Sequence, residues 1–272
     1  MSQNANVKQS GGGSSFSSMF PVLLIIASVV TGFLVFNYIL GDPSNFENGD
    51  PNGHPKVGNY LGMMYKGGIM VPILMSCFMI TIGITIERLL TLAVAGGKGN
   101  SNNFVRKVKD LLKGGNIDSA ISECDKQKGS VANVIREALG KYKIVDKDAS
   151  LDRDQKVAAV QKEVEESTSL ELPMLEKNLV ILSTLASVST LLGLLGTVTG
   201  MIRAFSAIAT AGAPDAVALS SGISEALINT ALGIGTSAIA VIMYNVFTTK
   251  IDKMTYSIDE AGYSIAQNFA IK

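Results

Sequence analysis

Four long apolar segments constrain this chain more than any other feature of its sequence. They cover Met19–Leu40, Gly67 to about Ala95, Leu179 to about Thr210, and Gly222 to about Thr248. Roughly 20 mainly apolar residues are enough for a helix to cross a bilayer. A span that does not belong to a closed barrel must be helical, because only then does it bond its own backbone groups. The sequence therefore predicts an all-α integral membrane protein with four transmembrane helices.

The charged residues lie outside these segments. Of the 272 residues, 47% are hydrophobic and 17% are charged, and residues 96–177 alone hold 15 Lys or Arg and 14 Asp or Glu. We expect this stretch to be a helical module that protrudes beyond the bilayer, with a polar helix from Asp154 to Lys177 running directly into the third span. Residues 1–18 are rich in Ser, Gly, Asn and Gln and are predicted to be a disordered tail. Residues 251–272 are predicted to be a helix outside the membrane.

Lys and Arg residues accumulate after the second span, which predicts the orientation because such residues stay in the cytoplasm. Five basic residues follow that span closely, namely Lys98, Arg106, Lys107, Lys109 and Lys113. The segment Gly41–Lys66 holds only Lys56 and Lys66. We therefore expect residues 96–177 and both termini in the cytoplasm, and Gly41–Lys66 on the periplasmic side as a turn-rich, exposed loop.

Composition and motifs argue against several classes of function. The net charge is zero and no basic run is present, so nucleic acid is not expected as a partner. The sequence has no Cys/His metal spacing, no phosphate-binding loop and no nucleophile motif, so we expect neither an enzyme nor a bound metal or cofactor. Cys77 and Cys124 lie in different segments and are predicted to be free thiols.

Ionisable residues within or beside a membrane span are costly, so each one is a candidate for a specific role. Glu87 and Arg88 are adjacent at the cytoplasmic end of the second span, where the long Arg88 side chain can reach lipid headgroups. A structural role is the favoured interpretation of this pair.

The last two spans carry small and hydroxyl-bearing residues at helical spacing, which places them on one stripe of each helix. The stripe of the third span comprises Thr190, Gly193, Thr197, Gly200 and Ala204, and that of the fourth comprises Ala226, Thr230, Gly233, Ser237 and Ala240. Such stripes let membrane helices approach closely. We expect the two spans to form the wall of a packed helical pore or interface, with tight contacts between subunits. The predicted packing residues are Gly193, Gly196, Gly200 and Gly233.

An antiparallel hairpin about a turn near Pro214 would place residues whose numbers sum to roughly 428 at equal depth. Arg203 and Glu225 would then share a level near the outer surface and form an ion pair, and Thr197 and Thr230 would share a deeper level. The threonines are either pore-lining hydroxyls or hydroxyls satisfied by their own helix carbonyls, and Glu225 is either functional or a solvated helix N-terminal carboxylate. Because no Asp, His or Lys lies mid-membrane, a proton pathway would take its titrating carboxylate from another subunit.

Five stretches in order along residues 67–250 carry a family resemblance, and together they are highly specific. They are Ile86–Leu90, Gly115–Cys124, Val131–Leu139, Leu191–Phe205, and Ile223–Gly235 continuing to Ala240–Asn245. Through them the chain resembles the ExbB/TolQ/MotA family of proton-channel proteins, and ExbB most of all. Residues 67–250 would be the family core.

The resemblance implies a pentamer in the bacterial inner membrane whose last two spans line a central, mostly apolar pore. That pore would hold the single membrane helices of an ExbD-like subunit with a titrating Asp, and the motor would act on a TonB-like protein that energises outer-membrane import. Carried over to this chain, Thr197 and Thr230 would be hydroxyls near that Asp, and Glu225 a carboxylate at the outer pore mouth. The alternatives are a TolQ-like or MotA-like stator with another output, and a purely structural membrane scaffold.

Three features depart from the family pattern. The Met19–Leu40 helix is an addition to the three spans that such chains generally have. Thr190 and Ile239 stand where the family often has proline, so the kinks expected there are in doubt. Arg203 lies at a position outside the family signature, so its pairing with Glu225 is an inference from this chain alone.

Overall fold

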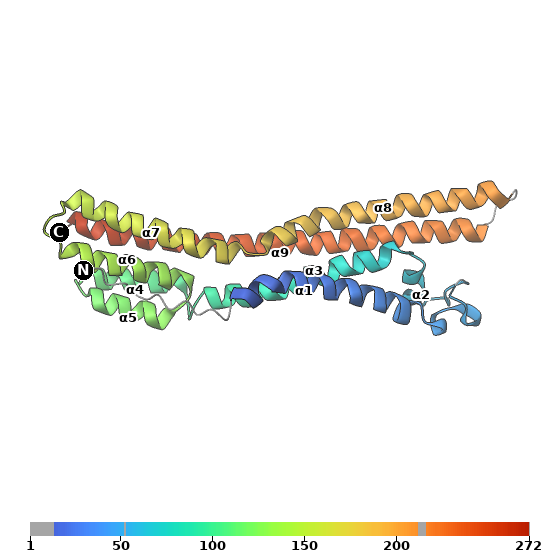
Figure 1. The fold of residues 1–272 in the computed structure, drawn as a ribbon, viewed down its shortest axis with the longest axis horizontal. Coiled ribbons are helices and arrows are strands. Elements are labelled where there is room, and N and C mark those ends of the chain that lie inside the picture. Colours follow the sequence, from blue (N-terminus) through green and yellow to red (C-terminus); the bar gives the residue numbers. More distant parts are fainter. Residues whose placement is uncertain (1–13, 52, 212–215, 272) are drawn as a thin grey trace. The chain divides into compact units, whose positions relative to one another are not determined.

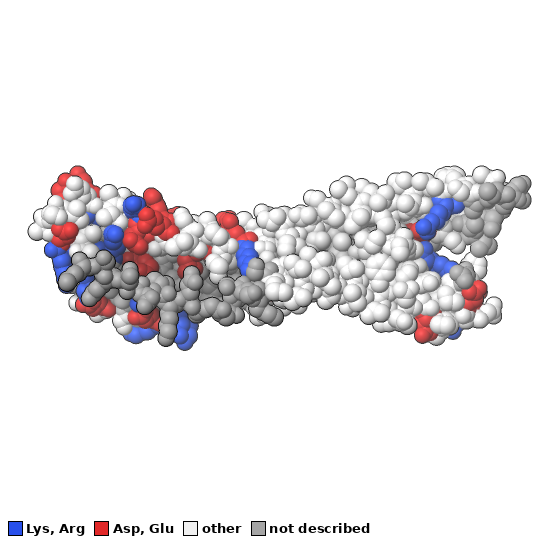
Figure 2. Space-filling model, in the orientation of Figure 1, with Lys and Arg blue, Asp and Glu red and all other residues white. Residues whose placement is uncertain are grey.

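The computed structural model describes residues 14–51, 53–211 and 216–271, and these are almost entirely helical (Figure 1). Four segments are long and apolar enough to cross a membrane, which confirms the predicted number of spans: Met19–Leu40, Met70–Ala95, Arg153–Ser206 and Leu219–Asn268. The helices fall into two units, one of residues up to Ile84 with Ile181–Val241, the other of Thr85–Val180 with residues from Ile242 onward. On the face shown in Figure 2, charged residues are spread over the second unit, whereas those of the first unit lie near one end and the rest of it is white.

In the first unit, α1 (Ser14–Val35) packs antiparallel against α3 (Met70–Ala95) (Figure 1). Small residues set their separation, since a Cβ on Gly32 would lie 2.6 Å from the Ser76 hydroxyl oxygen, and one on Gly83 would lie 2.7 Å from the Leu24 side chain. Helix α1 begins at Ser14, so residues 14–18, predicted to belong to the disordered tail, are helical. Residues 1–13 of that predicted tail lie outside the described residues.

Most residues of the segment between α1 and α3 are exposed, but the segment is folded into a cap around a few buried ones. It contains the short helical turns Phe36–Leu40, Pro43–Asn45 and Glu47–Gly49, followed by α2 (Tyr60–Tyr65). Phe46 is fully buried and packs edge-on against Tyr65 at a ring distance of 5.5 Å. The buried Asn45 amide donates to the carbonyl oxygens of Ile39 at 2.7 Å and Leu40 at 3.1 Å. These contacts satisfy the end of the first membrane helix, because its last carbonyls have no partner within the helix.

The second unit is a helical module with an apolar core. Its elements are α4 (Ser101–Lys113), α5 (Ile117–Gln127), α6 (Ser130–Asp146), α7 (Arg153–Glu176) and the later part of α9 (Ala216–Ile271). Tyr142 is fully buried at the centre of this module, where its hydroxyl lies 3.2 Å from the Asn268 amide nitrogen. An ion pair of 2.6 Å between Lys109 and Glu260 also joins α4 to α9.

The polar helix α7 does not run directly into the third span, contrary to the expectation from sequence. It ends at Glu176, and α8 (Leu179–Ala211) begins after a break at Lys177 and Asn178. Asn178 has φ +65°, a left-handed conformation that asparagine tolerates better than most residues. A residue in this conformation ends a helix, so α7 and α8 are separate elements.

Candidate functional site in the α8–α9 hairpin

Glycines bring α8 and α9 into backbone contact within the first unit, where the two helices run side by side (Figure 1). A Cβ on Gly193 would lie 3.1 Å from the Gly233 Cα, and one on Gly200 would lie 2.8 Å from the carbonyl oxygen of Gly222. A Cβ on Gly196 would overlap the Asn229 side chain. In the structure, both small-residue stripes are therefore occupied by the neighbouring helix of the same chain, whereas the sequence suggested contacts between subunits.

Thr197 and Thr230 lie at the same level of this hairpin, and their hydroxyls are hydrogen-bonded to each other. The Thr197 oxygen is also 3.2 Å from the Gly193 carbonyl oxygen, and the Thr230 oxygen is 3.1 Å from that of Ala226. Each hydroxyl has one proton to donate and two lone pairs to accept. One threonine therefore donates to the other, and the second donates to a carbonyl of its own helix, which combines both interpretations left open by the sequence.

The threonine pair retains capacity to accept a further hydrogen bond. Both side chains are only half-buried, and the exposed residues Leu194, Val198 and Leu227 surround them with apolar surface. Their hydrogens are used within the pair and toward backbone carbonyls, but lone pairs remain for a protonated acid or a water molecule. Threonine does not titrate near neutral pH, so the pair can position a proton carrier but cannot be one.

Closer to the start of α9, Arg203 and Glu225 form an ion pair with a distance of 2.7 Å. The Glu225 side chain is 8% exposed and that of Arg203 is 57% exposed, so the acid is held inside while its partner reaches the surface. Gly68 closes the site from the segment before α3. It has φ +70°, and a Cβ there would lie 2.7 Å from a Glu225 carboxylate oxygen.

Two residues that sequence analysis missed complete this site. Asn229, on the buried side of α9, donates its amide to the Gly67 carbonyl oxygen at 2.9 Å and so ties α9 to the segment before α3. Gly68 leaves room for the ion pair, as described above. A lone amide in an apolar span and a Gly67-Gly68 dipeptide ahead of another span were the available signals. The turn predicted near Pro214 lies outside the described residues.

The α8–α9 hairpin lies within the part of the chain that matches a known protein family. A model of the MotA/TolQ/ExbB proton channel family matches residues 126–260, which include both threonines and the Arg203–Glu225 pair. An ExbB-like biopolymer transport protein from Synechocystis sp. is 38% identical over 86 residues, which are 31% of this chain and 41% of that protein.

Two longer matches extend over more of the chain. The Tol-Pal system protein TolQ from Pseudomonas aeruginosa is 29% identical over 167 residues, which are 58% of this chain and 71% of that protein. The biopolymer transport protein ExbB from Pseudomonas putida is 26% identical over 219 residues, which are 75% of this chain and 61% of that protein. This chain thus spans less than two thirds of the length of the Synechocystis and Pseudomonas putida relatives.

Proposed function

We propose that this chain is the pore-forming subunit of a motor driven by the proton-motive force, because a model of the MotA/TolQ/ExbB proton channel family matches residues 126–260. The motor resides in the bacterial inner membrane as a homopentamer with cytoplasmic termini. An ExbD-like single-span subunit supplies the titrating Asp, and the output is work on a TonB-like protein for outer-membrane import.

The observation that carries this proposal is the hydroxyl pair formed by Thr197 and Thr230. The two hydroxyls can accept further hydrogen bonds and lie among apolar side chains. Both threonines are half-buried, so a group beside the hairpin can reach them. A protonated carboxyl group from a partner helix can donate to this pair, and its carboxylate can be bridged to the pair by a water. The hydroxyls thereby stabilise a proton carrier that this chain does not itself contain.

Glu225 is the proposed carboxylate of the outer pore mouth. Its position at the beginning of the last span would place it where protons enter from outside, and there it is buried and paired with Arg203. Gly68 leaves room for this carboxylate on the α3 side, and the Asn229 amide ties α9 to the neighbouring Gly67.

A second output within the same family is favoured by one specific observation. The relative that is 29% identical over 167 residues is named a Tol-Pal system protein, so a TolQ-like role in envelope maintenance stands as the alternative to energised import. A structural scaffold whose glycines only pack helices is the alternative of another class. A neighbouring gene for a single-span protein with a membrane Asp would favour the motor over the scaffold.

Replacing one threonine at a time by valine tests the proposal, because Val is nearly isosteric with Thr but lacks the hydroxyl. Thr197→Val and Thr230→Val should each lower energised import, measured in the native membrane with the partner subunit present, by about tenfold to hundredfold. That range corresponds to about 1.5–3 kcal/mol, the typical worth of a hydrogen bond to a charged group, and it applies to the water-bridged contact between the pair and the carboxylate. Thr197→Ser should retain most of the import rate because it keeps the hydroxyl.

Thr236 provides a matched control on α9. Its buried hydroxyl donates to the Leu232 carbonyl oxygen of its own helix at 2.8 Å, so Thr236→Val removes a hydroxyl without touching the threonine pair. Import in this variant should stay at the parental rate. If both Thr197→Val and Thr230→Val import normally and keep an intact envelope, the two threonines are packing residues. If import is normal but the envelope becomes leaky, the TolQ-like output replaces the import role.

A further inference from the structure

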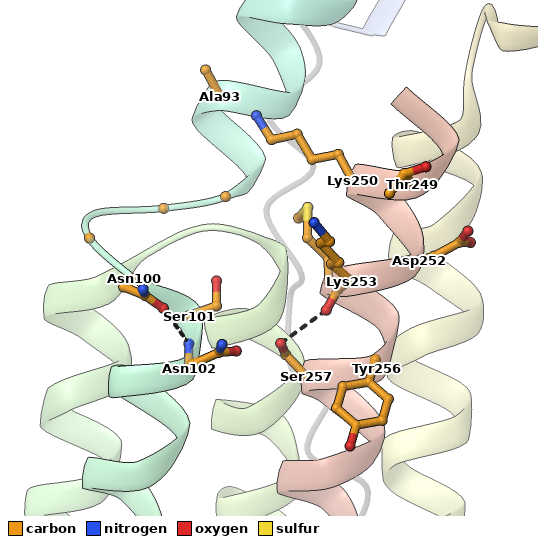
Figure 3. A pocket seen from close by; sticks show the side chains of 14 residues that line it. Ala93, Asn100, Ser101, Asn102, Thr249, Lys250, Asp252, Lys253, Tyr256 and Ser257 are labelled. Atoms are coloured by element: carbon orange, nitrogen blue, oxygen red, sulfur yellow. Dashed lines mark hydrogen bonds between the residues drawn. The ribbon is translucent and has the colours of Figure 1, made fainter. Parts of the chain in front are cut away.

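A pocket of about 890 Å³ opens within the second unit between the start of α4 and the middle of α9 (Figure 3). One wall consists of the end of α3, the glycine-rich loop after it, and the first turn of α4. The other wall is the stretch of α9 from Thr249 to Ser257. Nothing in the proton-pathway proposal uses this pocket.

The α9 wall is positively charged on the side of the pocket. Lys250 and Lys253 are three residues apart and so lie on one face of the helix. Asp252 is the acidic residue among those that line the pocket, and Figure 3 shows its carboxylate directed away from Lys250, which extends toward Ala93 at the end of α3. Within the part of the chain that the structure describes, neither lysine belongs to an ion pair. Both charges are therefore available to an anion.

The opposite wall adds hydrogen-bond donors. Helix α4, 13 residues long, begins at Ser101, and Asn100 caps it by accepting a hydrogen bond from the Asn102 backbone at 2.9 Å. Backbone N–H groups at such a start carry partial positive charge and favour anions. Gly97 and Gly99, with φ +71° and +95°, turn the chain tightly before it. Phosphate, with several acceptor oxygens, matches lysines on one wall and N–H or hydroxyl donors on the other.

The location of the pocket identifies the source of the phosphate. Helix α3 ends at Ala95, and α9 has no charged residue between Glu225 and Lys250, so both helices leave their apolar stretches at this level. Ile242 is 60% exposed and Val246 is 48% exposed. Both lie on the same face of α9 as Lys250 and Lys253 by helical spacing. This face is therefore apolar from the lysines into the membrane span. Basic pockets at this depth are typical sites for acidic lipid headgroups.

We propose that this pocket binds the headgroup of an anionic phospholipid such as phosphatidylglycerol. Lys250 and Lys253 pair with its phosphate, the first turn of α4 donates to the phosphate from the other wall, and an acyl chain lies along Val246 and Ile242. The site joins α9 to α4 through a lipid and is independent of the output of the motor.

Lipid titration of the purified full chain tests this assignment. Phosphatidylglycerol and phosphatidylcholine are added separately in neutral detergent, and bound lipid is counted by native mass spectrometry. The parent protein should prefer phosphatidylglycerol, and Lys250→Gln with Lys253→Gln should weaken its binding by roughly tenfold to thirtyfold while leaving phosphatidylcholine unaffected. Lys250→Arg with Lys253→Arg should bind like the parent, because the charge and donors remain.

A charge-matched control separates the pocket from general electrostatics. Lys147→Gln with Lys162→Gln removes the same two charges elsewhere in the module and should bind phosphatidylglycerol like the parent. Three results would each overturn the proposal. The control could lose as much phosphatidylglycerol binding as the Lys250/Lys253 glutamine variant, the parent could bind both lipids equally, or the glutamine variant could bind phosphatidylglycerol as tightly as the parent. Displacement of the lipid by an equal concentration of inorganic phosphate would reassign the pocket to a soluble anion and would also overturn it.

Discussion

Arg88 shows how a single charged residue is accommodated at the edge of a membrane span. It is 1% exposed, so the expectation that it extends to lipid headgroups is wrong, while a structural role agrees with its contacts. Its guanidinium pairs with Glu87 and donates to the carbonyl oxygens of Leu175 at 3.3 Å and Met174 at 3.5 Å. Those carbonyls end α7 and lack helical partners, so Arg88 anchors the end of that helix.

Arg88→Met should therefore destabilise the protein strongly. The change leaves the Glu87 carboxylate without its counter-charge and two carbonyls without a donor, and breaking a buried pair in this way typically costs about 3–5 kcal/mol. Denaturant unfolding in detergent, followed by circular dichroism, measures the loss in free energy of unfolding. Addition of Glu87→Gln in the same chain should recover part of that loss. A midpoint for Arg88→Met equal to that of the parent would contradict the anchoring role.

Cys124 should be nearly inert toward thiol reagents. Burial in the core of the second unit raises the pKa of its thiol from an ordinary 9.0 to about 12. Because only the thiolate reacts, alkylation at pH 8 in a Cys77→Ala background should be roughly a thousandfold slower than in denaturant. The raised pKa also means that this thiol contributes stability below pH 9 that declines as pH rises from about 9 toward 12. Equal labelling rates in the folded and unfolded protein would contradict the burial of Cys124.

At the scale of secondary-structure elements, the α8–α9 contact depends on glycine at defined positions. A Cβ on Gly233 would lie 2.5 Å from the Ser189 carbonyl oxygen and 2.8 Å from the Gly193 Cα, both backbone atoms. Gly233→Ala should force the helices apart at a cost of about 1–3 kcal/mol. The melting temperature in detergent, measured by circular dichroism, should fall by about 2–10 °C.

Gly235 is the matched control for this prediction, since it lies two residues away on α9 and a Cβ there would meet nothing within 4 Å. Gly235→Ala should leave the melting temperature unchanged or raise it slightly, because alanine favours helix more than glycine does. If the melting temperature fell equally in Gly233→Ala and Gly235→Ala, the close approach of α8 and α9 would not depend on glycine at position 233.

At the scale of the whole molecule, the separation of charged from apolar residues predicts opposite sides of the membrane for the cap before α3 and for the charged module. Val57 in the cap is 98% exposed, and the Lys162 side chain on α7 is 73% exposed. With Val57→Cys and Lys162→Cys made separately, an impermeant maleimide should label only Val57→Cys in intact spheroplasts. Both should label after permeabilisation. Background labelling should be low, because both native cysteines are buried. The reverse pattern would invert the proposed topology.

The sequence alone was sufficient to predict the elements and their register in the last hairpin. Apolar length predicts spans, and equal rise per residue in two antiparallel helices aligns Arg203 with Glu225 and Thr197 with Thr230, which the structure brings into contact. These inferences use only spacing along the chain. They needed no knowledge of what else packs nearby.

Only the tertiary structure decided which neighbour each face meets. Periodicity identifies the glycine stripes but cannot tell a helix of the same chain from one of another subunit, and the structure assigns both stripes to the α8–α9 contact within one chain. The burial of Arg88 depends on carbonyls 87 residues away at Leu175, and the space beside Glu225 depends on Gly68. Such contacts join segments that are distant in sequence, so a local pattern such as the Gly67-Gly68 dipeptide can mark a residue but does not tell which neighbour it meets.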